Sequence, residues 1–170
     1  MSRAFTKEDD RSAELLVVPR APLPRGAPNY VTARGLGRLH AEQAALEQER
    51  IALEASDSVD RSVRLNALAQ RAMELQARLA STELVDPRSQ AHDCVRFGAQ
   101  VRVRHASGDE SSYRIVGVDE ADAAAGLLAF TAPLARALLG KRVGDVAQLQ
   151  TPRSSEELTV LEIGYEAFDP

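Results

Sequence analysis

The chain has 170 residues and a formal net charge of −4, and aromatic residues make up only 4% of it, with no Trp. A chain of this charge lacks the broad positive field that drives autonomous binding to DNA or RNA, and so few aromatic side chains exclude a base-stacking platform. Hydrophobic residues make up 44%, which is enough for a buried core. We therefore expect any contact with nucleic acid to go through another protein.

The single cysteine, Cys94, excludes an internal disulfide and fits a reducing compartment. The apolar run 15–18 is too short for a signal peptide or a membrane span. These features predict a soluble cytoplasmic protein with no membrane partner. Residues 1–31 contain four prolines among arginines and glycines, without a sustained hydrophobic period. This composition predicts an extended or disordered arm.

Residues 32–86 have the pattern of two helices that pack against each other. Thr32 is a good N-cap for the first helix, and both helices carry leucine along one stripe, which must be buried against a partner. The break EASDSVDR is short and polar, so we expect the helices to fold back antiparallel. The first stripe contains Leu36, Leu39, Leu46 and Leu53, and the second contains Leu65, Leu68, Ala72, Leu75 and Leu79.

The same segment predicts the hairpin's outer face and its end. Glu74 and Arg78 are four residues apart and are expected on the outer face, and Pro87 is expected to end the second helix. An intramolecular hairpin predicts a monomer. A coiled-coil scaffold that dimerises through the leucine stripe is the alternative, and the mass in solution separates the two.

Residues 91–170 change to the short alternating and β-branched runs that are typical of strands. Ser107–Asp109 is expected to form a turn, and a short helix is expected from Pro133 to a C-terminal Gly140. The fold class is therefore α+β: an N-terminal antiparallel coiled-coil hairpin followed by a small β-domain with one short helix. The expected strands are CVRF, QVRVRH, SSYRIVGV, LLAF, VAQLQ and ELTVLEI.

Asp57 and Asp60 are the candidate functional residues, because they place two carboxylates at the turn of the hairpin. Such a cluster could hold a hard cation such as Mg²⁺. The alternative is that Asp57 caps the second helix and Asp60 lies in its first turn, where the helix dipole favours an anion. The three histidines are not at ligand spacing from one another or from Cys94, so no intrinsic metal site is expected. No motif of an independent enzyme occurs.

The second half of the chain resembles a known family. FGAQVRVRHASGDESSYRIVGVDE, PLARALLGKRVGDVAQLQTP and LEIGY resemble the C-terminal domain of the Gre transcript-cleavage factors, the GreA/GreB family. NYVTARGLGRL and ELQARLASTELVD resemble the two ends of that family's coiled coil, so the similarity covers residues 29–166. The resemblance implies that residues 91–170 form an FKBP-like domain that binds bacterial RNA polymerase at the rim of its secondary channel.

The resemblance also implies a role for the hairpin. In the family it projects down the channel, and acidic residues at its tip help to position a Mg²⁺ ion with which the polymerase cleaves its own backtracked RNA. Nucleic acid is then met only within the polymerase complex, and the chain itself is not an enzyme. Asp57 and Asp60 match the spacing of the family's acidic pair.

Three features depart from the family pattern. The Gly, Asn and Tyr that shape the family's tip are missing from ASDSVDRSVR. The hairpin is expected to be shorter by roughly two turns on each arm, which costs on the order of 10 Å of reach. In the family, a three-residue sequence (an acidic residue, Ser and Pro) contacts polymerase, and we call it the docking step. Here Thr131, Ala132 and Pro133 occupy these positions. These differences predict a polymerase-binding elongation modulator with weak or no stimulation of transcript cleavage.

Other functions stay open at this point. One is a working cleavage factor that uses Asp57 and Asp60. Another is a regulator of nucleoside diphosphate kinase like Rnk, a short-hairpin relative. A prolyl isomerase is a third, because the β-domain resembles FKBP, but that activity needs an apolar pocket rich in aromatic residues. The available aromatic residues are Phe97, Tyr113, Phe130, Tyr165 and Phe168.

Overall fold

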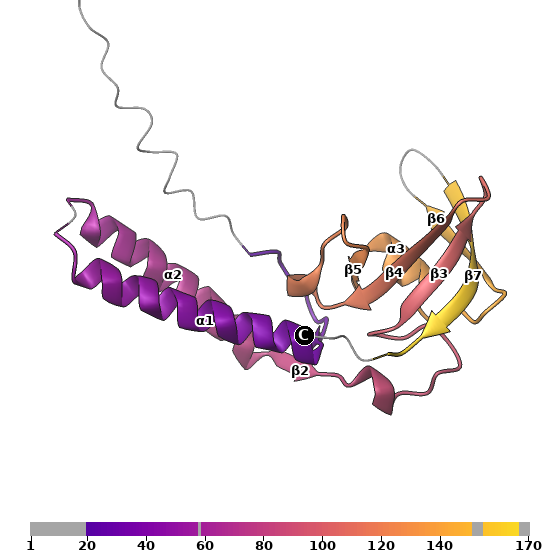
Figure 1. Ribbon diagram of the computed structural model, residues 1–170, viewed down its shortest axis with the longest axis horizontal. Helices are drawn as coiled ribbons and strands as arrows, with labels where there is room; N and C mark the ends of the chain where they lie inside the picture. Colours follow the sequence, from indigo (N-terminus) through magenta and orange to yellow (C-terminus); the bar gives the residue numbers. More distant parts are fainter. Residues whose placement is uncertain (1–19, 58, 151–154, 167–170) are drawn as a thin grey trace, which may run out of the picture.

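The computed structural model describes residues 20–57, 59–150 and 155–166. Residues 1–19 of the predicted arm lie outside the described residues. Two long antiparallel helices, α1 (Ala33–Glu54) and α2 (Arg61–Ala80), form a hairpin that projects from a curled β-domain, as Figure 1 shows. The predicted α+β fold is confirmed. None of the helices in the described ranges is long and apolar enough to span a membrane.

The leucine stripes form the core of the hairpin, as the heptad spacing predicts. Ala72, which was also expected in the stripe, is exposed. Thr32 caps α1 as predicted, because its side chain accepts a hydrogen bond from the Gly35 backbone N–H at 3.0 Å. The buried leucines are Leu39, Leu46, Leu53, Leu68 and Leu75, and Leu36, Leu65 and Leu79 pack beside them half-buried.

The base of the hairpin differs from the prediction. Strand β1 (Asn29–Val31) lies inside the segment predicted as an arm, and it pairs in parallel with β2 (Thr82–Leu84). Helix α2 therefore ends at Ala80, well before Pro87, which instead begins the 3₁₀-helix η2 (Pro87–Ser89). Three-residue strands carry too little periodicity to be recognised in a sequence, and the pairing of β1 with β2 joins residues about fifty positions apart.

The β-domain is a five-stranded sheet with the order β5-β4-β3-β7-β6, antiparallel except for the parallel pair β4–β5. Helix α3 (Pro133–Leu138) buries Ala135 and Leu138 in the core of the domain. The predicted turn at Ser107–Asp109 and the predicted end of α3 before Gly140 are both observed. The other elements are β3 (Gln100–His105), β4 (Glu110–Val116), η3 (Val118–Glu120), β5 (Leu127–Ala129), β6 (Val146–Gln150) and β7 (Ser155–Gly164).

The predicted strand CVRF is not a strand. Its backbone is bonded to the loop after α3 instead: the Val95 N–H donates to the Lys141 carbonyl, and the Gly140 N–H donates to the Val95 carbonyl, both at 2.8 Å. The Tyr165 hydroxyl donates to the Cys94 carbonyl at 2.5 Å. Burial raises the pKa of this phenol, so the hydroxyl keeps the proton it donates. The segment is buried, but tertiary contacts decide its conformation.

The two domains meet through a buried carboxylate. Glu120 of η3 is 2% exposed and accepts a hydrogen bond from the Thr32 N–H at 3.0 Å and another from the Thr32 hydroxyl. A Cβ on Gly35 would lie 2.2 Å from the Glu120 carboxyl group, and one on Gly117 would lie 2.6 Å from the Tyr30 carbonyl oxygen. Only glycine allows the start of α1 to approach the β-domain this closely.

Candidate functional site

The predicted acidic site lies at the end of the hairpin farthest from the β-domain (Figure 1). Both Asp57 and Asp60 are exposed. Neither side chain has a hydrogen-bond or ion-pair partner among the described residues, although their neighbour, residue 58, lies outside the description. The part of the chain that is described contains no group of three or more His, Cys, Asp or Glu residues that could hold a metal ion. A cation at this tip would need further ligands from a partner.

The capping role expected for Asp57 is wrong. Helix α2 begins at Arg61, so Asp60 occupies the N-cap position and Asp57 lies three residues before it. The Asp60 side chain makes no capping hydrogen bond, and its ψ of 14° differs from the extended ψ of the Thr32 cap. Asp60 therefore places its negative charge at the N-terminus of the helix, but its carboxylate oxygens accept no hydrogen bond from the helix backbone.

The predicted docking step lies between β5 and α3. Thr131 and Ala132 are half-buried, and Pro133 is exposed at the first position of α3. The Ala132 N–H donates to the Ala129 carbonyl at 2.8 Å, and the Ala132 side chain packs against the core. Of the three residues, Pro133 therefore presents the most surface to a partner.

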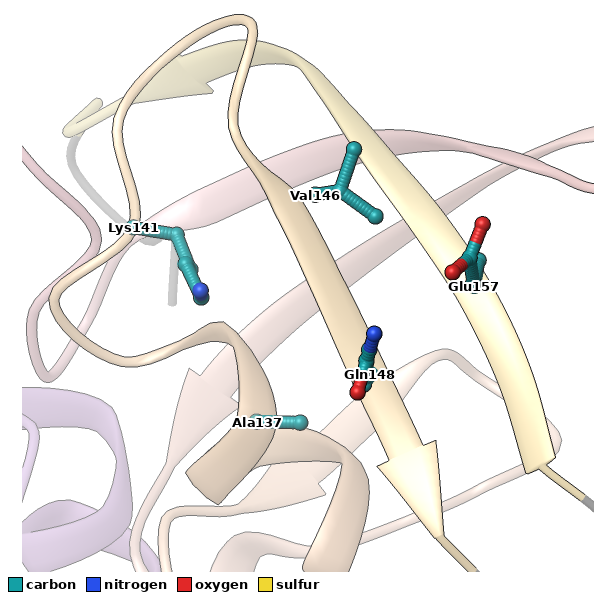
Figure 2. A pocket seen from close by; sticks show the side chains of 5 residues that line it. All are labelled: Ala137, Lys141, Val146, Gln148 and Glu157. Atoms are coloured by element: carbon teal, nitrogen blue, oxygen red, sulfur yellow. The ribbon is translucent and has the colours of Figure 1, made fainter.

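A hollow of about 510 Å³ on the β-domain was not predicted from the sequence (Figure 2). It lies between the end of α3 and the outer face of strands β6 and β7, and its lining combines an ammonium, an amide and a carboxylate with an apolar surface. Val146 is 45% exposed there, and Val143, in the preceding loop, is 60% exposed. The residues that line the hollow are Ala137, Lys141, Val146, Gln148 and Glu157.

A charged cluster at the junction of the two domains was also missed. Arg78 was expected on the outer face with Glu74, but it is only 9% exposed and its Nε lies 3.5 Å from the Asp119 carboxylate. Arg20 donates to Asp119 at 2.8 Å and to Glu42 at 2.6 Å. The i,i+4 rule for Glu74 and Arg78 failed because a carboxylate from a distant part of the chain covers this side of α2.

Three aromatic side chains, Tyr30, Phe97 and Phe130, line an open hollow of about 400 Å³ beside the base of the hairpin. Their rings pack against one another with centroids 5.5–5.9 Å apart, where the hairpin base meets the β-domain. Tyr113 and Tyr165 pack in or against the core of the β-domain, and Phe168 lies outside the described residues. The contacts of Tyr30 with Phe97 and Phe130 thus connect the base of the hairpin with the β-domain.

The fold defines a class of protein in which a helical hairpin with an exposed acidic tip projects from a small curled sheet. Residues 90–165 match the family model for the C-terminal domain of the transcription elongation factors GreA and GreB. The chain is 35% identical to GreB of Yersinia pestis over 156 residues, a match that covers 83% of this chain and 91% of that protein. The chain therefore belongs to the GreA/GreB family of transcription elongation factors.

Two further proteins are similar to the chain. GreA of Helicobacter pylori (strain ATCC 700392 / 26695) is 36% identical over 96 residues, and this match spans 56% of this chain but only 58% of that protein. The solved GreA/GreB factor from Nitrosomonas europaea is 23% identical, with a TM-score of 0.40, and the match covers 82% of this chain and 99% of that one.

Proposed function

We propose that the chain is a cytoplasmic, monomeric elongation modulator that binds bacterial RNA polymerase through residues 91–170 and directs its hairpin into the secondary channel. Family membership supports the partner. A monomer follows if the leucine stripe has no second partner, because α1 and α2 already bury it against each other. The chain itself catalyses no reaction, and any transcript cleavage takes place in the active site of the polymerase.

The exposed surface beside α3 is the observation that carries the docking proposal. Val143 and Val146 are large apolar side chains that the β-domain leaves in solvent, next to Lys141. Pro133 is exposed at the opposite end of the short helix. Apolar side chains surrounded by polar groups are the usual centre of a protein interface. We assign the polymerase contact to Lys141, Val143 and Val146, which we call the α3–β6 surface, and to Pro133 beside it.

Val146→Asp tests the assignment. The new carboxylate would have to be desolvated in the interface, so the affinity for core RNA polymerase is expected to fall by about tenfold or more. Met73→Asp is the matched control, because Met73 is 72% exposed on α2 and its replacement should change the affinity little. A labelled chain titrated with polymerase gives both values, and thermal unfolding verifies that both variants are folded. A loss with Met73→Asp alone would move the contact to the hairpin.

Stimulation of cleavage is proposed to be weak or absent. The tip lacks the residues that shape it in the family, and α1 has 22 residues, which corresponds to about 33 Å. A carboxylate must lie close to 2.1 Å from Mg²⁺ to coordinate it. A shortfall of several ångströms therefore removes the contact completely.

A working cleavage factor is the second candidate, and the state of the tip favours it. The side chain of Asp60 is not used as a cap, and Asp57 does not cap α2 either, so both carboxylates are available to a metal ion held by a partner. Helix capping was the alternative to a metal role for these two residues, and neither side chain makes a capping hydrogen bond to α2. Hairpin reach and tip shape are the remaining arguments for weak activity.

Asp57→Asn separates the two candidates. In the modulator, the variant and the wild type should both leave the cleavage of backtracked RNA near the rate of polymerase alone. Asp60→Asn should cost only about 0.3–1 kcal/mol of stability through the helix dipole. In a cleavage factor, each substitution removes an anionic ligand and keeps the shape, so cleavage would collapse while polymerase binding persisted. Gel analysis of stalled complexes gives the rates, and strong wild-type cleavage abolished by Asp57→Asn would overturn the weak-activity proposal.

A further inference from the structure

The start of α1 is tied to the β-domain by Glu120, next to the packing of Tyr30 on Phe97 and Phe130. Glu120 holds the Thr32 N–H and hydroxyl, and its Oε1 also accepts from the Gly117 N–H at 3.3 Å. The two contacts with the hairpin are both made at Thr32, the N-cap residue of α1, whereas the Gly117 contact lies within the β-domain. Contacts at one end of a rod fix the position of that end, and they leave much of the direction of the rod to contacts farther along it.

A second anchor lies farther along the hairpin. Arg20 joins Asp119 of the β-domain to Glu42, which is ten residues beyond Thr32 and therefore about 15 Å along α1. Asp119 is only 7% exposed and Arg20 is 19% exposed, so both ion pairs are partly shielded from water. Burial alone would lower the pKa of the Arg20 guanidinium, but its hydrogen bonds to the two carboxylates raise it. Arg20 therefore keeps its positive charge between the two carboxyl groups.

Asp119 depends on Arg20. The contact with Arg78 is long, at 3.5 Å, and both the Asp119 Oδ2 and the Arg78 Nη1 have no hydrogen-bond partner among the described residues. In the part of the chain that is described, the hydrogen bond to the Asp119 side chain comes from Arg20. Arg78 also donates to the carbonyl of Ala21, so the chain beside Arg20 is fastened to α2 as well. Residues 20 and 21 thus form a strap across the junction.

We propose that Arg20 is a positioning residue that, with Asp119, sets the direction in which the hairpin leaves the β-domain. This inference rests on the proposed function, in which the β-domain docks and the hairpin enters the channel. A rotation of about 10° at the base displaces a tip about 33 Å away by about 6 Å. Docking of the β-domain alone would then not fix the position of the hairpin tip. The strap, through the direction of the hairpin, determines where Asp57 and Asp60 lie in the channel.

The direction can be measured without polymerase. Spin labels are attached at Met73→Cys on α2 and Ser112→Cys on β4, both exposed positions, in the full chain with the buried Cys94 replaced by serine. Electron–electron double resonance then gives the distribution of distances between hairpin and β-domain. The labelled parent is expected to give one narrow distribution. Arg20→Ala should give one at least about twice as wide, because the hairpin then samples several directions about the Glu120 anchor.

Arg50→Ala is the matched control. Arg50 also bridges two carboxylates, Glu47 at 2.7 Å and Glu54 at 2.6 Å, but both lie on α1, so its loss should leave the distribution unchanged. Asp119→Asn keeps the shape of the buried side chain and should broaden the distribution as Arg20→Ala does. The unfolding midpoints verify that each labelled variant is folded.

An unchanged distribution in both Arg20→Ala and Asp119→Asn would overturn the proposal. A change of the same size in Arg50→Ala would also overturn it, because the effect would then not be specific to the junction. Since polymerase is absent, these results are independent of the α3–β6 surface. If the positioning role is correct, Arg20→Ala still binds polymerase with an affinity near that of the wild type.

Discussion

Glu120→Ala is expected to lower the free energy of unfolding by about 3–5 kcal/mol, because it leaves the buried N–H groups of Thr32 and Gly117 without an acceptor. The Thr32 hydroxyl loses its partner as well. Loss of Glu120 therefore removes hydrogen bonds from the N-cap region of α1 and from the domain junction at the same time. Denaturant unfolding followed by circular dichroism gives the change.

Glu83→Ala is the control for this variant, because Glu83 is an exposed glutamate of β2, and it should change the stability by less than about 0.5 kcal/mol. Glu120→Gln should fall between the two, since the amide keeps one acceptor oxygen and loses the charge. A Glu120→Ala variant as stable as Glu83→Ala would mean that the junction is not held by this carboxylate.

Leu68→Ala is expected to destabilise the protein by about 2–5 kcal/mol, through lost burial and the cavity left in the hairpin seam. Leu68 is 5% exposed and packs with the leucines of α1. Met73→Ala lies on the same helix at a position that is 72% exposed and should cost little. Thermal unfolding of the two variants compares a buried and an exposed position of α2. A neutral Leu68→Ala would indicate that the helices do not pack through this stripe in solution.

The parts of the fold that could be predicted are those specified by neighbours in the sequence. Both helices could be predicted from the heptad leucines, because residues three to four positions apart lie on the same face of a helix. Thr32 gave the first cap, and five of the six alternating runs became strands of the sheet. Pro133 and Gly140 set the limits of α3, since proline suits the first turn of a helix and glycine the position after its end.

The features that could not be predicted depend on contacts between distant residues. The run CVRF has the composition of a strand, but its backbone is bonded to residues 140 and 141. Strand β1 needs β2, and Arg78 is buried because Asp119 reaches it from the other domain. A charged residue at i+4 from a glutamate is normally a surface residue, and nothing local indicates otherwise.

The candidate sites were predicted in part. The position of Asp57 and Asp60 at an exposed tip followed from the break in the leucine pattern, but the start of α2 was placed too early and the capping role assigned to Asp57 was wrong. For the surface that we assign to docking, only the neighbouring residues Thr131, Ala132 and Pro133 were named from the sequence. The α3–β6 surface could not be predicted, because Val143 and Val146 look like strand or core residues until the sheet places their side chains in solvent.

A cryo-electron microscopy structure of the full chain bound to core RNA polymerase tests the central proposal most directly. It should place Pro133 and the α3–β6 surface against the rim of the secondary channel, with the hairpin pointing into the channel and Asp57 ending short of the catalytic Mg²⁺. A complex held through the hairpin alone, or a hairpin that stays outside the channel, would contradict the account.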